Sequence, residues 1–226
     1  MPRTPKARTK SPAAAKHEIT TVAEHACLIA RDSAANMVEF LSHGSRMAYL
    51  AMKDCEKELD QVEQNIDEQL PAAIAQVGEA RARELLASLR FVTELERIGD
   101  LILWVAHRLH TSPIRLADVD NEELQEMARI LHSMLDIMYQ GFTQRDLSKA
   151  GTVLRMDCDM DRLRHSFFKR HLSGRKTQDM TLPIAVLLMA QALERAGDHA
   201  TNLAEELYHL VEGRSRRHPP KRKTES

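Results

Sequence analysis

A seven-residue segment near the middle of the chain returns, almost unchanged, close to its end. Glu94–Asp100 reads ELERIGD and Ala192–Asp198 reads ALERAGD. Glu96 and Glu194 are 98 residues apart, and so are the aspartates that end the two segments. A repeat at this distance in a chain of 226 residues predicts two copies of one structural unit. Each copy carries two carboxylates four residues apart, which are neighbours on one helix face.

Helices are favoured by the composition, in which aromatic residues are only 4%. Apolar residues recur at helical spacing in six stretches, and no stretch has the pattern of a strand. The expected helices are 17–42, 45–76, 79–110, 120–143, 146–172 and 179–212. Gly44 is expected to end the first helix, Pro71 to kink or break the second, and a cap at Asp120 or Asn121 to start the fourth. The sequence therefore predicts an all-α fold of two tandem three-helix bundles, 17–112 and 119–213.

The charge is divided unevenly along the chain. Residues 1–16 and 214–226 are basic and are expected to be disordered tails. Residues 18–213 keep 21 of the 32 Lys and Arg and 32 of the 33 Asp and Glu, a net charge of −11. An acidic body is a poor nucleic-acid binder, so no nucleic-acid partner is expected. The tails could instead approach an anionic surface.

Several features favour a cytoplasmic protein. The chain has three cysteines and no CxxC pair, which argues against a disulfide framework or a zinc site. The basic N-terminus lacks the apolar region of a secretory signal. The most apolar stretch, Leu182–Leu193, is too short to span a bilayer.

Acidic pairs also occur on the middle helix of each half. Glu56 and Asp60 match Asp157 and Asp161 at an offset of 101 residues. Each half therefore carries two such pairs on two helices joined by a short loop. Carboxylates gathered on adjacent helices suit a hard or borderline cation such as Mg, Ca, Mn or Fe. The alternative interpretation is that these pairs form only a solvated face.

Three segments resemble one known family. They are Leu193–Glu206 (LERAGDHATNLAEE), Asp157–Asp161 (DCDMD) and Leu95–Asp100 (LERIGD), and they look like the signature of the PhoU phosphate-regulation family. The resemblance spans residues 17–213. It implies two three-helix repeats and a cytoplasmic regulator of phosphate uptake that works between a phosphate ABC transporter and a membrane sensor histidine kinase.

The resemblance also implies metal ligands, because some members bind multinuclear iron or other metals through E(D)-x-x-x-D motifs. By matching, the ligands would be Glu56, Asp60, Glu96, Asp100, Asp157, Asp161, Glu194 and Asp198. Iron is the expected metal, with Mn, Mg and Zn as alternatives. The expected partners are the transporter ATPase and the kinase, and a homodimer is kept as an alternative to a monomer.

One departure from the pattern separates the two halves. Asn202 and Glu205 continue the polar stripe in the second half, where the first half has Trp104 and His107. The second-half metal site is therefore expected to be the stronger. His107 is interpreted as a surface or capping group rather than a ligand. Trp104 is interpreted as core, with a partner contact as the alternative.

Three functions remain open from these features. The first is the phosphate regulator, tuned by metal. The second is a metal-carboxylate bundle with a storage or redox role, although the Glu-x-x-His motif of di-iron bundles is missing. The third is a helical scaffold whose acidic faces serve only solvation. No nucleophile motif or HExxH occurs, so enzymatic activity is not expected.

Overall fold

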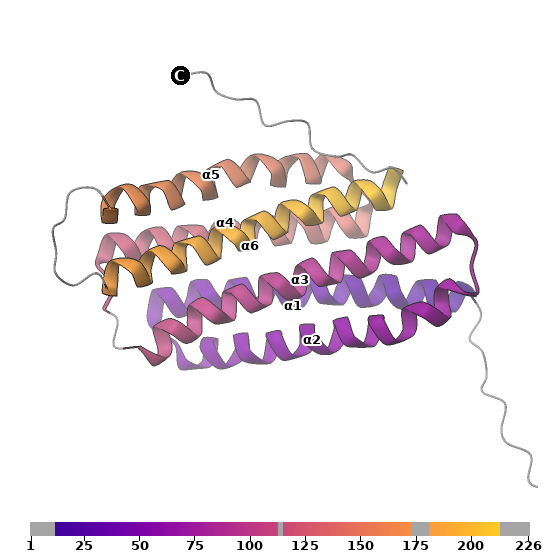
Figure 1. Cartoon of the computed structure of the whole chain (residues 1–226), viewed down its shortest axis with the longest axis horizontal. Coiled ribbons are helices and arrows are strands. Elements are labelled where there is room, and N and C mark those ends of the chain that lie inside the picture. Colours follow the sequence, from indigo (N-terminus) through magenta and orange to yellow (C-terminus); the bar gives the residue numbers. More distant parts are fainter. Residues whose placement is uncertain (1–11, 113–114, 173–180, 213–226) are drawn as a thin grey trace, which may run out of the picture.

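The computed structural model describes residues 12–112, 115–172 and 181–212, which form six long helices (Figure 1). No strand occurs within these ranges. The helices are α1 (Pro12–His43), α2 (Arg46–Ile74), α3 (Glu79–Thr111), α4 (Asp118–Gln144), α5 (Leu147–Leu172) and α6 (Thr181–Glu212). The all-α prediction is confirmed, and five of the six helices start within two residues of their predicted start. The predicted basic tails lie mostly outside the described residues.

Two three-helix bundles lie side by side in Figure 1. Helices α1, α2 and α3 pack on one another, as do α4, α5 and α6, and the bundles meet where α1 contacts α4 and α3 contacts α6. One hydrophobic core runs through both bundles, with Met52 and Leu59 in the first and Leu131 and Leu193 in the second. Each such side chain contributes about 1.5–3 kcal/mol when fully buried. The repeat therefore folds into two units that share a core.

Helix ends follow local chemistry. Gly44 has φ +63°, a left-handed conformation that glycine adopts without strain, and it ends α1 as predicted. The Ser45 hydroxyl then accepts a hydrogen bond from the Ala48 amide at 3.3 Å and caps α2. Pro71 lies inside α2, which continues to Ile74, so a break at this proline is not observed. Helix α1 starts at Pro12, ahead of the predicted 17, since proline is favoured in a first helical turn.

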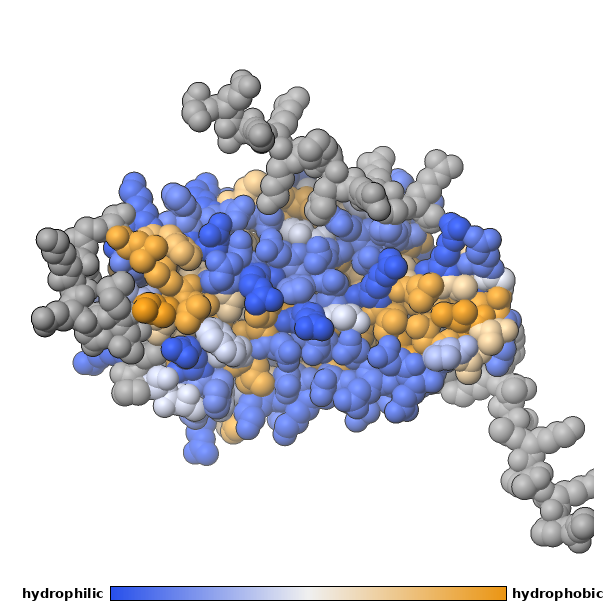
Figure 2. All heavy atoms as spheres, in the orientation of Figure 1, coloured by the Kyte–Doolittle hydropathy of each residue, from blue (hydrophilic) through white to orange (hydrophobic). Residues whose placement is uncertain are grey.

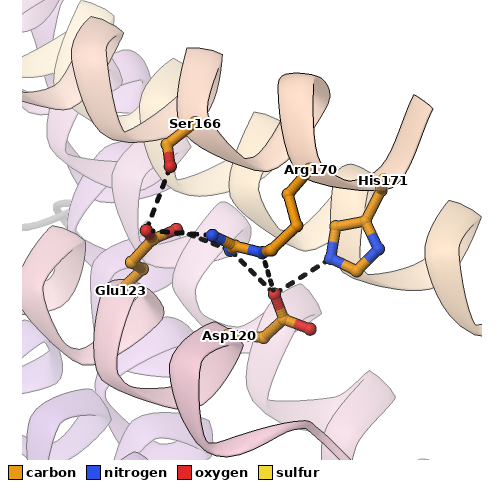
Figure 3. Close-up of polar contacts among 5 residues, drawn as sticks. All are labelled: Asp120, Glu123, Ser166, Arg170 and His171. Carbon is orange, nitrogen blue, oxygen red and sulfur yellow. Dashed lines mark hydrogen bonds and ion pairs between the residues drawn. The ribbon is translucent and has the colours of Figure 1, made fainter. Parts of the chain in front are cut away.

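The start of α4 differs from the prediction. Its N-cap residue is Ala117, and no side chain caps it. Asp120 instead lies within the first turn and is buried, where its Oδ1 accepts hydrogen bonds from Arg170 at 2.8 Å and pairs with His171 at 2.9 Å (Figure 3). Arg170 also donates to Glu123 at 2.7 Å. This cluster ties the start of α4 to the end of α5, so the predicted cap is in fact an interhelical ion pair.

A glycine in each repeated segment sets how closely the helices approach. A Cβ on Gly99 of α3 would lie 2.6 Å from Leu59 Cδ1 of α2, and one on Gly197 of α6 would lie 3.3 Å from Met160 of α5. Leu59 and Met160 each precede the second acid of their pair. The glycines therefore accommodate side chains that bring the acid-bearing helices together. In no described helix is there an apolar stretch long enough to cross a membrane.

Candidate metal centre

Three carboxylates converge where α2 packs against α3. Asp60 and Glu63 extend from α2 and Glu96 from α3, and one oxygen of each lies within 4.8 Å of the others. The pairing follows from the contact between Leu59 and Gly99, which holds this turn of α2 against this turn of α3. Oxygen atoms at such separations can ligate a single cation.

Two residues of α3 contact this cluster. The Thr93 hydroxyl of α3 donates a hydrogen bond of 2.7 Å to Glu63 Oε1. Arg97 Nε lies 3.6 Å from Glu96 Oε2, with most of the arginine side chain exposed to water. An exposed ion pair of this length is weak. The cluster is therefore positioned by protein contacts but not neutralised by them.

Burial and electrostatic repulsion together perturb Glu96, the α3 member of the cluster. The pKa of Glu96 rises from 4.5 to about 7, chiefly through burial and then through the nearby charges of Asp100, Glu63 and Asp60, while Arg97 lowers it. Burial, with Asp100 and Asp60, also raises the pKa of Glu56. Four of the predicted residues, Glu56, Asp60, Glu96 and Asp100, thus share one field of negative charge. A bound cation would relieve this repulsion.

The donor set fits a hard cation. All three converging ligands are carboxylates, the type that Mg, Ca and Mn prefer, and ferrous iron also accepts them. The group contains no histidine or cysteine, which zinc would more usually bring. Three protein oxygens leave positions for water, as is usual for Mg²⁺.

The second half arranges the corresponding carboxylates differently. Arg164 of α5 lies among them, with its Nε 3.1 Å from Glu194 Oε1 and a terminal nitrogen 3.5 Å from Asp161 Oδ1. Gln191 donates a hydrogen bond of 2.5 Å to the other oxygen of Glu194. Burial and then Asp198 raise the pKa of Glu194, while Arg164 opposes them.

The residues predicted as ligands are therefore arranged differently in the two halves. In the described part of the chain, Asp157, Asp161, Glu194 and Asp198 do not form a group of three converging ligands, whereas the first half forms one. Glu63 is a candidate ligand that the sequence analysis did not name. It lies one turn after Asp60 on the same acidic stripe, and this spacing was the signal that it shares the site.

The two residues that interrupt the first-half stripe have different environments. Trp104 is 42% exposed, so its interpretation as core is wrong. The Arg108 guanidinium lies 5.7 Å from the centre of its ring. His107 is exposed, as its interpretation as a surface group predicts, and its Nδ1 pairs with the Tyr49 hydroxyl at 2.9 Å, so it also links α3 to α2.

Comparison with known proteins places both halves in one family. The PhoU domain model matches residues 23–109 and again residues 124–207, which are the two bundles. The chain belongs to the PhoU family. A phosphate-specific transport system accessory protein PhoU homolog from Burkholderia sp. is 29% identical over 188 residues, 80% of each chain. The corresponding homolog from Rhizobium meliloti is 32% identical over 165 residues, 69% of this chain and 68% of the relative.

Solved PhoU structures share the fold. PhoU from Pseudomonas aeruginosa superposes with a TM-score of 0.79 at 20% identity, covering 90% of this chain and all of that one. The regulatory protein PhoU from Streptococcus pneumoniae gives the same TM-score and identity over 92% of this chain. The three-carboxylate cluster lies within the first PhoU domain and Arg164 within the second.

Proposed function

We propose that this protein regulates phosphate uptake and phosphate-starvation signalling without enzymatic activity of its own. The family membership of both halves carries this proposal, supported by relatives named as accessory proteins of the phosphate-specific transport system. In the proposed role the protein is an adaptor between the phosphate ABC transporter ATPase and the sensor histidine kinase. It would work in the cytoplasm, next to the inner face of the membrane.

An exposed apolar surface on α3 and α6 suits such docking. Helix α3 runs antiparallel to α6, so its C-terminal part lies beside the N-terminal part of α6 (Figure 1). Trp104 of α3 and Ile184 and Leu188 of α6 are 42%, 49% and 45% exposed. Figure 2 shows apolar surface at both ends of this face, with a hydrophilic middle. Exposed aromatic and aliphatic side chains of this kind mark protein contacts.

A shallow hollow lies between Trp104 and Asp100, which is an electrostatic neighbour of the acidic cluster. It has a volume of about 440 Å³ and is lined by Asp100, Leu101, Leu103, Trp104 and His107. Asp100 is also one of the charges that raise the pKa of Glu96. A cation held by Asp60, Glu63 and Glu96 would lower the negative potential at the edge of the hollow. Metal binding and partner docking are therefore proposed to be coupled through Asp100.

The metal contributes charge and positioning in this proposal, with no chemical step. Mg²⁺, Ca²⁺ or Mn²⁺ is favoured by the donor set and Fe²⁺ is also accepted, and the residues that would hold the ion are Asp60, Glu63 and Glu96. They join α2 to α3 on the surface of the bundle. A storage or redox role is less favoured, because such sites are built from ligands that project into a bundle core.

The deciding experiment deletes the gene and restores it as variants. Without the protein, phosphate-regulated genes should stay active in phosphate-rich medium, and the intact chain should restore repression. Trp104→Ala should lose both repression and capture of the transporter ATPase and kinase. Leu154→Ala is a matched control, since Leu154 of α5 is 39% exposed but lies outside the proposed face. Normal repression in the deletion strain, with neither partner captured by the intact chain, would refute the regulator proposal.

A further inference from the structure

Comparison of the two halves, residue by residue, reveals a reversal of charge within the acidic constellation itself. The offset that matches Glu56 and Asp60 to Asp157 and Asp161 also matches Glu63 to Arg164. Glu63 is one of the three converging carboxylates of the first half. At the equivalent position the second half has a guanidinium. An acidic ligand and a fixed cation thus occupy the same place in two copies of one unit.

Contacts around Arg164 show what this guanidinium does. It lies 3.1 Å from Glu194 and 3.5 Å from Asp161, which match Glu96 and Asp60 of the first half. Glu194 is only 8% exposed, so its charge needs compensation. The guanidinium also lies 5.7 Å from the centre of the Phe168 ring, one turn along α5, a cation–π contact that fixes its position. Arg164 therefore bridges α5 to α6 where a cation would bridge α2 to α3.

We propose that Arg164 is a built-in counter-ion of the second acidic constellation, so that this chain takes a dication in its first half only. The proposal rests on the metal binding proposed above for the first half. It departs from the equivalence of the two halves that the repeated motifs imply. A dication placed between Asp161 and Glu194 would face the positive charge of Arg164 at close range. To bind there it would have to displace the guanidinium from both carboxylates.

Two consequences follow for how the halves respond to metal. A cation from solution would strengthen the contact between α2 and α3, because Asp60, Glu63 and Glu96 repel one another without it. The contact between α5 and α6 carries its own cation and is independent of metal supply. In this proposal, metal availability changes the interhelical contact in the first bundle, while the corresponding contact in the second bundle is unaffected.

In the test, electron paramagnetic resonance measures free Mn²⁺ in the presence of the full chain. Bound Mn²⁺ is the difference between total and free Mn²⁺. The intact chain should bind about one Mn²⁺. A first-half-neutral variant, Asp60→Asn with Glu96→Gln, should bind none above background. Adding Arg164→Glu to that variant should restore binding of about one Mn²⁺, because it recreates the acidic residue found at Glu63. Arg162→Glu, an exposed charge reversal two residues away, is the matched control and should restore nothing.

The outcomes separate this proposal from the metal function itself. Binding of Mn²⁺ by the first-half-neutral variant with Arg164 in place would overturn the counter-ion proposal. So would the absence of any gain with Arg164→Glu in a chain whose circular dichroism is unchanged. If the intact chain binds no Mn²⁺, the first-half site fails, while the gain on Arg164→Glu still decides the second half.

A milder variant covers a failure of Arg164→Glu to fold. Arg164→Gln removes the positive charge and adds no carboxylate, and in the first-half-neutral background it should bring Mn²⁺ binding above background. Binding that stays at background in that folded variant would overturn the proposal in the same way.

Discussion

Replacing Glu96 by glutamine should stabilise the protein at alkaline pH and leave it unchanged at acid pH. The pKa of Glu96 rises from 4.5 to about 7 on folding, chiefly through burial and then through Asp100, Glu63 and Asp60. Below pH 4.5 the carboxyl is protonated in both states. Between pH 4.5 and about 7 the unfolded chain loses this proton while the folded chain keeps it, so the free energy of unfolding falls as pH rises. Above about pH 7 both states are ionised and the loss is complete.

The size of the effect follows from the same interval. A pKa that moves from 4.5 to about 7 corresponds to about 3.4 kcal/mol if the whole shift is realised. Part of the side chain contacts water, and solvent screening reduces the cost to about 1–2 kcal/mol. Glutamine keeps the shape of Glu96 without its charge. Glu96→Gln should therefore raise the free energy of unfolding by about 1–2 kcal/mol at pH 8 and change it little at pH 4.5.

Urea unfolding followed by circular dichroism, in the presence of a chelator, measures this difference at the two pH values. Glu68→Gln is the control, since Glu68 is an exposed residue of the same helix as Asp60 and should change stability by less than about 0.5 kcal/mol. If Glu96→Gln destabilises the protein at pH 8, or raises the free energy of unfolding equally at both pH values, the reasoning is refuted. The cost of Glu96 would then not arise from the ionisation of its carboxyl group in this cluster.

Three further predictions concern packing, a buried ion pair and metal. Gly99→Ala should cost up to about 2 kcal/mol in urea unfolding, because its Cβ would lie 2.6 Å from Leu59 and overpacking outweighs the gain in helix propensity. Gly197→Ala should be neutral or stabilising by up to about 1 kcal/mol, since a flexible methionine can yield there. An equal loss of unfolding free energy in both variants would contradict this difference. Arg170→Met should lower the free energy of unfolding by about 2–4 kcal/mol, because it leaves buried Asp120 with one fewer partner. Adding Asp120→Asn to Arg170→Met should recover part of this loss. Additive losses from the two substitutions would argue against their coupling. Mn²⁺ should raise the melting temperature more at pH 8 than at pH 5, because protons compete for the carboxylates; a pH-independent rise would point to binding elsewhere.

Local physics explains why the helices were predictable. Apolar residues at helical spacing mark the faces that must be buried. The stripe of α6, which includes Leu193 and Leu203, is buried in the core. Gly44 ends α1 because glycine adopts its left-handed conformation freely. Repetition of a segment along the chain then gave the number of bundles. These features depend on residues that are close in sequence, so they can be predicted from the sequence.

The candidate cation site was only partly predictable, because it depends on neighbours in space as well as in sequence. Helical spacing placed Glu96 beside Asp100, and the repeated acidic pairs named Glu56 and Asp60 of α2, but neither indicated that Glu63 would join Asp60 and Glu96. Glu63 joins them because Leu59 packs at Gly99 and fixes the offset between α2 and α3. The expectation that the second half holds the stronger site rested on Asn202 and Glu205 of α6, whereas the contacts of Arg164 on α5 depend on tertiary packing.

What the sequence by itself determined is the family, the six helices, their pairing into two equivalent bundles and the identity of the acidic helix faces. Only the tertiary structure decided that Asp120 is a buried partner of Arg170 rather than a cap, and that Trp104 faces solvent. It also decided that one half gathers three carboxylates while the other encloses a guanidinium. Periodicity fixes the direction of a side chain around its own helix. The distance between charges on two helices depends on how their cores interlock, which is a property of the packed chain.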